Sequence, residues 1–267
     1  MAWHHDFRLA IQKTASGASL LASHNYVDSL AQLTEAFHGV LTTKQVLERD
    51  THLQCEDSET LCIPCVAAKQ QLFPAHIQHH PESNYSSSDA YDGYNGLEFH
   101  FLCKIPIVFD GNSILGEDTT TASSAAIPRI HHHQHVYQGV NLLLATILYN
   151  MALIIHLRSD LTVDRKIALN LYNKAFDILS EPMIVHQKMA NDTDVRALLA
   201  IILNNKAVLL YENGDYSGCR TSRNLLILCL NTISTKSQKS FLSSTQDISE
   251  MYRNGFLLVP PSVAGAA

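Results

Sequence analysis

The chain has 267 residues, 46% of them hydrophobic, with 19 basic and 25 acidic side chains, which is enough apolar material for one large or two ordinary domains. Charged residues make up 16% of the chain, against roughly a quarter in an average soluble protein, and Gly (11) and Pro (8) are scarce. This composition excludes a disordered chain, disfavours a turn-rich all-β fold and, with a formal charge of −6, offers no attraction to nucleic acid or to an anionic membrane.

The N-terminal sequence MAWHHDFRLAIQK contains His, Asp, Arg and Gln where a signal peptide needs an unbroken apolar run. We therefore expect the protein not to be secreted and to be intracellular, either cytoplasmic or nuclear. In such a compartment, the six cysteines are expected to be reduced thiols rather than a disulfide framework.

The first predicted element is a helical hairpin over residues 7–41. Apolar residues recur there at helical spacing, and the pattern breaks at Ser23-His24-Asn25, which predicts the turn between the two helices. From residue 42 to residue 94, Gln, His, Ser and acidic residues dominate. A stretch such as His79 to Asp89 has too few apolar side chains to order itself, so we expect 42–94 to be a flexible polar insertion.

Residues 95–134 are predicted to form an extended segment followed by a linker. The sequence GLEFHFLCKIPIVF, from Gly96 to Phe109, is aromatic and β-branched with partial alternation, and Asp-Gly pairs bound it on both sides. It predicts one or two short β-strands. Thr119 to Ile130 is rich in Thr, Ser and Ala and indicates a linker into the next helix.

Residues 135–255 are predicted to be a helical block, and residues 256–267 a tail. The block contains four amphipathic stretches, at 139–157, 163–179, 194–213 and 216–233, and a final helix from about Ser244 to Asn254-Gly255. The segment from Val140 to Leu157 is nearly long enough to span a membrane. Because Asn141, Asn150 and His156 interrupt it and no basic cluster flanks it closely, we expect a buried helix and no membrane span.

Three predicted hairpins share a spacing of small residues. In the first and third hairpins the small residue of the second helix follows that of the first by twelve positions (Gly17 and Ser29; Ala207 and Cys219), and the second hairpin has four additional residues between them. Small residues allow two helix backbones to approach closely where they cross. The residues expected to make this repeated packing are Gly17, Leu20, Leu33, Ala36, Ala152, Ala168, Tyr172, Ala175, Ala207 and Cys219.

These motifs resemble the tetratricopeptide (TPR) hairpin, whose pattern contains W-x2-L-G-x2-Y followed by A-x3-F. The best match is Tyr149-Asn150-Met151-Ala152 with Ala168, Tyr172 and Ala175. The second best is Asn204-Asn205-Lys206-Ala207 in the third hairpin, where Lys206 occupies a position that is normally apolar. The layout of the whole chain is similar to divergent TPR-like proteins of algal genomes, which carry no assigned activity. The resemblance implies a mainly α fold of antiparallel helical hairpins, an α-solenoid interrupted by the polar insertion.

The same resemblance implies that the first helix of each hairpin lines a concave, peptide-binding side. Asn150 and Asn205 occupy equivalent positions in the second and third hairpins, where such proteins hydrogen-bond the backbone of a ligand. An amide side chain suits this role because it both donates and accepts hydrogen bonds. The alternative is that these two residues bridge neighbouring helices of the protein itself.

The insertion contains a possible metal or redox site. Cys62-Ile63-Pro64-Cys65 is a C-x-x-C motif, and His76 and His80 follow it at a spacing close to that of a zinc finger; Cys55 is a further potential ligand. The run His131-His132-His133-Gln134-His135 is expected to bind metal only weakly. A metal- or redox-responsive protein is therefore the alternative to an interaction protein.

The sequence has no recognisable catalytic motif. It lacks a P-loop, G-x-S-x-G, H-E-x-x-H and G-x-G-x-x-G, so we expect no enzymatic activity, no cofactor and no small-molecule substrate. The leading hypothesis is a non-catalytic interaction or scaffold protein whose partner is another protein or a peptide.

Overall fold

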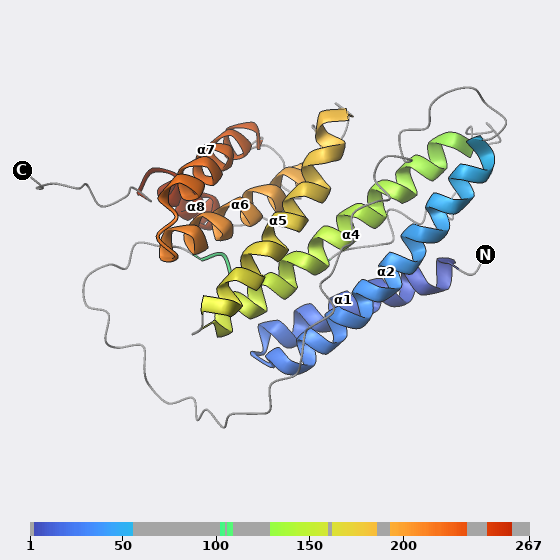
Figure 1. Ribbon diagram of the computed structural model, residues 1–267, viewed down its shortest axis with the longest axis horizontal. Coiled ribbons are helices and arrows are strands. Elements are labelled where there is room, and N and C mark those ends of the chain that lie inside the picture. The colour runs from blue at the N-terminus through green and yellow to red at the C-terminus, as the bar shows by residue number, and fades with distance from the viewer. Residues whose placement is uncertain are drawn as a thin grey trace, which may run out of the picture. The chain divides into compact units, whose positions relative to one another are not determined.

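The computed structural model describes residues 3–55, 102–104, 106–108, 129–159, 162–185, 193–233 and 245–257, and these residues are almost entirely helical (Figure 1). The helices are α1 (Trp3–Ala22), α2 (Tyr26–Cys55), α4 (Arg129–Arg158), α5 (Thr162–Val185), α6 (Thr193–Glu212), α7 (Tyr216–Thr232) and α8 (Thr245–Leu257). The prediction of a mainly α protein is confirmed. The chain divides into two compact units, residues 1–45 with 99–267 and residues 46–98.

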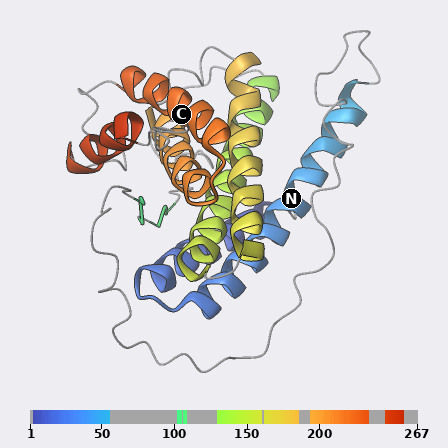
Figure 2. The ribbon, with the colours of Figure 1, turned by 60° about the vertical axis from the view of Figure 1, so that its left-hand side comes forward.

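Consecutive helices of the C-terminal half pack as antiparallel pairs, α4 with α5 and α6 with α7, and α5 also packs on α6 (Figures 1 and 2). The first helix of each pair is buried on nearly all sides: from Val140 to Ile154 only Leu142 is not buried, and from Val195 to Leu210 only Arg196 and Lys206 are not. The helices α5 and α7 bury a single face, as amphipathic helices do at a surface. Finally, α8 covers parts of α6 and α7.

One helical segment, Tyr137–Arg158 of α4, is long and apolar enough to cross a membrane when judged by length and composition. In this structure 83% of its most apolar stretch is buried inside the protein. A helix that neighbouring helices cover on several sides needs the same composition as a membrane span. The observed burial is that of the expected core helix.

The turns of the first and third hairpins have the same geometry. His24 and Gly214 adopt left-handed backbone conformations, with φ of 62° and 75°. The following residues, Asn25 and Asp215, each donate their backbone N–H to the carbonyl five residues earlier, at 2.9 Å in both turns. These are the bonds of a Schellman motif, which satisfies the last carbonyls of the preceding helix.

The residue after each turn also caps the next helix. The Oδ1 atom of Asp215 accepts the backbone N–H of Gly218 at 2.9 Å, and the Oδ1 atom of Asn25 accepts that of Asp28 at 3.4 Å. A short polar side chain at this position satisfies one of the free N–H groups of a helix start. The sequence match between Asn25-Tyr26 and Asp215-Tyr216 therefore reflects the same local structure.

Close helix contact in the first hairpin depends on Gly17. The Ser29 hydroxyl donates a hydrogen bond of 2.7 Å to the Gly17 carbonyl, and a Cβ atom added to Gly17 would lie only 2.8 Å from Cγ of Leu33. A small residue is thus required where α1 and α2 cross. Among the other residues assigned to repeat packing, Leu20 is half-buried, and the buried ones are Leu33, Ala36, Ala152, Ala168, Tyr172, Ala175, Ala207 and Cys219.

The helix α2 is longer than expected. It runs to Cys55, past the predicted boundary at residue 41, so the first residues of the predicted insertion 42–94 are helical. The reason is that the buried stripe of the helix continues: Thr43 and Leu47 follow Val40 at helical spacing and are buried.

The helix α4 starts earlier than expected, at Arg129 rather than near His135, so the predicted linker in 95–134 ends inside a helix. No Pro or Gly lies between Arg129 and Gln138 to stop the helix, and Pro128 immediately precedes it, where a proline is well tolerated. Further along, the ammonium of Lys44 lies 5.5 Å from the ring centre of Tyr137 in α4.

Of the predicted β segment at 96–109, the structure describes residues 102–104 and 106–108, and these belong to neither a helix nor a sheet.

Candidate functional site

Two asparagines on different helices hold the backbone of a distant part of the same chain. Asn150 in α4 and Asn205 in α6 are fully buried. Asn150 accepts the N–H of Ile107 at 3.0 Å and donates to its carbonyl at 2.9 Å. Asn205 accepts the N–H of Cys103 at 2.9 Å and donates to its carbonyl at 2.9 Å. Equivalent residues of consecutive hairpins therefore make the same pair of bonds. The two residues that they bind, Cys103 and Ile107, are four positions apart along the chain.

This pair of bonds is typical of an extended backbone. The N–H and C=O groups of one residue point to the same side in a β-strand, where a neighbouring strand binds both of them. Here one amide side chain takes the place of the neighbouring strand. We call residues 102–104 and 106–108 the clamped segment (Figure 2). Its exposure alternates as expected for extended chain: Cys103 and Ile107 are buried, whereas Lys104 and Val108 are exposed.

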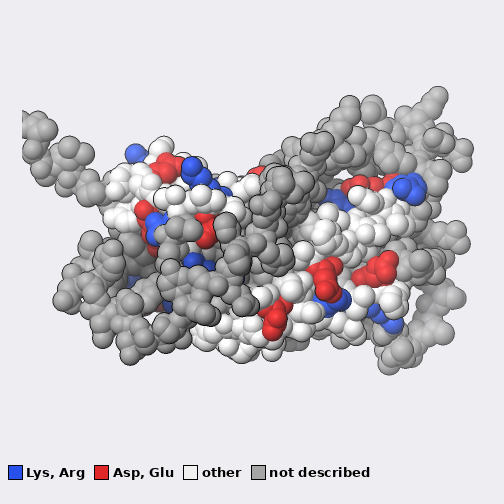
Figure 3. Space-filling view, turned by 60° about the horizontal axis from the view of Figure 1, so that its bottom comes forward, with Lys and Arg blue, Asp and Glu red and all other residues white. Residues whose placement is uncertain are grey.

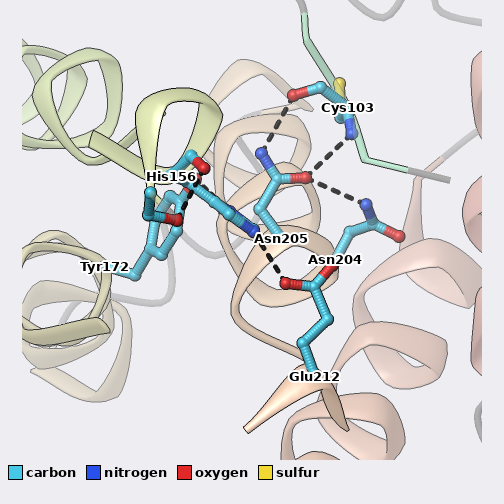
Figure 4. A network of polar contacts seen from close by, with 7 residues as sticks. Cys103, His156, Tyr172, Asn204, Asn205 and Glu212 are labelled. Atoms are coloured by element: carbon cyan, nitrogen blue, oxygen red, sulfur yellow. Dashed lines mark hydrogen bonds and ion pairs between the residues drawn. The ribbon is translucent and has the colours of Figure 1, made fainter. Parts of the chain in front are cut away.

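Further polar side chains support the Asn205 contact (Figure 4). The Tyr149 hydroxyl donates to the Cys103 carbonyl at 3.1 Å. Asn204 donates to Oδ1 of Asn205 at 3.0 Å, and Asn254 of α8 donates to Oδ1 of Asn204 at 2.8 Å. These bonds fix the orientation of the Asn205 amide, with its oxygen toward the Cys103 N–H and its nitrogen toward the Cys103 carbonyl.

A second set of titratable groups adjoins this network (Figure 4). Nδ1 of His156 lies 3.4 Å from the Tyr172 hydroxyl, and Nε2 of His156 lies 3.6 Å from Oε2 of Glu212. Burial raises the pKa of the Tyr149 phenol and that of the Tyr172 phenol well above the ordinary value. Both phenols therefore keep their protons at neutral pH and remain hydrogen-bond donors.

The chemistry of this site is that of backbone recognition. The side chains that bind the clamped segment are amides and a phenol, which exchange hydrogen bonds with peptide groups. On the face shown in Figure 3, basic and acidic residues are interspersed among mostly uncharged ones. Within the described ranges, no group of three or more His, Cys, Asp or Glu residues could hold a metal ion.

The predicted metal ligands are not brought into this site. Cys62, Cys65, His76 and His80 lie outside the described residues, and Cys55 is the last residue of α2. The run from His131 to His135 lies in the first turns of α4. The prediction of a metal or redox site in the insertion stays a prediction.

Comparison of the chain with profiles of known protein families, with curated protein sequences and with solved structures gave no match. The candidate site is thus defined by its geometry in this chain.

Sequence reasoning selected Asn150 and Asn205 but missed the residues around them. The structure places these two asparagines against Cys103 and Ile107 of their own chain, and adds Tyr149, Asn204 and Asn254 as supporting residues. One available signal was the pair Asn204-Asn205 inside a mostly apolar run. A buried polar side chain needs a hydrogen-bond partner, and the backbone groups of its own helix are already bonded to one another. Two adjacent asparagines in such a run therefore indicate a partner elsewhere in the chain.

Proposed function

We propose that this protein is a non-catalytic interaction or scaffold protein, built from TPR-like helical hairpins, that binds extended peptide segments along α4 and α6. The observation that carries this proposal is the pair of equivalent contacts by Asn150 and Asn205. Each amide binds the N–H and the C=O of a single residue, which is recognition of peptide backbone. Repetition of one structural unit gives helical arrays an extended binding surface on which equivalent positions can make the same contact.

The local structure of the hairpins supports the TPR-like part of the proposal. The first and third hairpins share the same Schellman turn and the same type of helix cap. Gly17 provides the close crossing that the small-residue spacing requires. A final helix, α8, covers the last pair, as terminal helices do in such arrays. The array is an α-solenoid interrupted between α2 and α4.

The chemistry of the site favours a protein or peptide as the partner. Amide clamps match the donor and acceptor of a peptide group, whereas phosphate groups are bound by clustered Lys and Arg or by free N–H groups at helix starts. The proposal therefore includes no nucleic acid, no membrane and no small-molecule substrate. A separate part of the proposal is a location inside the cell, in the cytoplasm or nucleus.

Affinity purification with the 267-residue chain tests the proposal. The test variant carries Asn150→Leu and Asn205→Leu, and the matched control carries Asn170→Leu, the same chemical change at an exposed position of α5. We expect the natural chain and the control to capture the same protein partner, and the double variant to lose it under conditions in which circular dichroism shows that its helical content is retained. A partner that the double variant retains, or turnover of a substrate by the purified protein, would overturn the proposal.

A further inference from the structure

We propose that the clamped segment is an internal ligand, and that the Asn150 and Asn205 clamp accepts in its place an extended peptide from a partner protein. The expected peptide has a small apolar residue at its first clamped position and a β-branched aliphatic residue four positions later, with proline allowed immediately before the latter. This inference rests on the proposed function and specifies the class of partner.

The first step of the argument is that the clamp bonds only to backbone. The four amide bonds go to the N–H and C=O groups of Cys103 and Ile107, and the Tyr149 hydroxyl also bonds to a backbone carbonyl. Any extended chain offers the same groups at these two positions. The single backbone requirement is an N–H at each, which excludes proline there.

The second step concerns the side chains that the site encloses. Cys103 is 0% exposed and Ile107 is 4% exposed, so the site encloses one small and one branched apolar side chain. Lys104 is exposed and Val108 is 57% exposed, so the position after each clamped residue faces solvent. Pro106 lies directly before a clamped residue. Having no N–H, it shows that the clamp uses no backbone donor at that position.

The third step is that an empty clamp is unfavourable. Asn150 and Asn205 are fully buried amides, and a buried polar group that loses its partner destabilises a protein because it no longer has either water or a protein group to bond with. The site therefore favours an occupant. The clamped segment is covalently attached, so it competes at an effective concentration on the order of millimolar or less. An external peptide should bind weakly to the natural chain and tightly once the internal segment is disabled.

The experiment uses the full chain with Cys103→Pro and Ile107→Pro, which removes the two N–H donors and leaves the amino-acid sequence of every helix unchanged. The probe is a fluorescent peptide, Leu-Ala-Lys-Ile-Pro-Ile-Val, matching residues 102–108 with Ala in place of Cys103. Fluorescence anisotropy is expected to show at least tenfold tighter binding to the variant than to the natural chain.

Two modified peptides supply the matched controls. N-methylation at the positions of Cys103 and Ile107 removes the donors that the clamp binds, and should abolish binding. N-methylation at the position of Lys104, whose N–H the clamp does not use, should preserve it. Equal binding of these two peptides, or the absence of saturable binding by a variant that retains its helical content, would overturn the inference.

A second measurement uses the natural chain and remains decisive if the proline variant does not fold. The Cys103 thiol is buried under the clamp, so displacement of the segment should expose it. Millimolar peptide is expected to accelerate alkylation of Cys103 several-fold, measured by mass spectrometry, while Cys219 in the core of the α6 and α7 pair stays unreactive. An unchanged Cys103 rate contradicts the inference.

The remaining outcomes separate the possible occupants. A dimer of the natural chain that disappears in the proline variant would assign the clamp to a second copy and overturn the partner-peptide assignment. A partner protein could be captured in a way that requires Asn150 and Asn205 but leaves the Cys103 thiol protected from alkylation. That result would refute displacement of the clamped segment while leaving the proposed function intact.

Discussion

Alanine at Gly17 and alanine at Gly39 should change the stability of the protein in opposite directions. Both glycines lie in the helices of the first hairpin, Gly17 in α1 and Gly39 in α2. A Cβ atom at Gly17 would lie 2.8 Å from Cγ of Leu33 and 3.3 Å from the backbone oxygen of Ser29. A Cβ atom at Gly39 would meet Ala10 Cβ at 3.5 Å, an ordinary contact.

The magnitudes follow from two terms. Replacing Gly by Ala inside a helix gains up to about 1 kcal/mol from backbone preference. Forcing an extra methyl group into a packed core loses about 1–3 kcal/mol. The first term is common to both sites, and the second applies only to Gly17, because Leu33 is fully buried and cannot move away freely. We expect Gly17→Ala to lower the free energy of unfolding by about 1 kcal/mol and Gly39→Ala to raise it by about 0.5–1 kcal/mol.

Urea unfolding followed by circular dichroism measures both variants. Their difference isolates the packing term, and adding Leu33→Ala to the Gly17→Ala variant should remove the crowding between the two positions. A double-mutant cycle with a coupling of at least about 1 kcal/mol is the expected result. Equal stabilisation by the two glycine substitutions would refute the argument that Gly17 is required for the helix crossing.

Three further predictions concern the second and third hairpins. Asn205→Leu should lower the free energy of unfolding by about 2–4 kcal/mol, because the Cys103 N–H and one Asn204 N–H lose their acceptor. The control Asn170→Leu should change this free energy by less than about 0.5 kcal/mol, and urea titration measures both variants. Asp215→Ala should lower it by about 1 kcal/mol through loss of the α7 cap, detectable as a fall in the melting temperature. Burial lowers the pKa of the Lys206 ammonium below 10.5, so holding this charge opposes folding at neutral pH. Lys206→Met should therefore stabilise the protein by less than about 1 kcal/mol at pH 7, and the gain should shrink as the pH rises toward and past 10.5, where the unfolded lysine also becomes neutral; unfolding curves at several pH values test the sign.

The helices could be predicted because their signals are local. Periodic apolar residues and turn residues such as Asn25 and Asp215 act within a few positions of the chain, and the structure has helices and turns at those places. The ends of α2 and α4 were harder to place. The first residues of the predicted insertion still carry the buried stripe of α2. The prediction of an insertion came from the average composition of residues 42–94, which does not reveal a short helical stretch at one end.

The occupant of the site could not be predicted from the sequence. The prediction that Asn150 and Asn205 bind a ligand backbone followed from their equivalent positions. Nothing local connects Asn205 to Cys103, which is 102 residues away in the chain, because that contact depends on how the helices pack. The aromatic and β-branched composition around Cys103 and Ile107 predicted extended chain. The groups that bind its backbone are the side chains of Asn150 and Asn205 rather than another strand.

The row of amides from Asn254 through Asn204 to Asn205 has a direction. Each amide offers its oxygen to the preceding nitrogen and its own nitrogen to the next oxygen or carbonyl, so turning one amide over would place like groups together along the whole row. Through Asn254, the C-terminal helix α8 therefore supports the orientation of the amides that lead to Cys103. Removing α8 would remove the hydrogen bond from Asn254 to Oδ1 of Asn204. The Asn205 site would then discriminate less well between a peptide that binds in the N-to-C direction of the clamped segment and one that binds in the opposite direction.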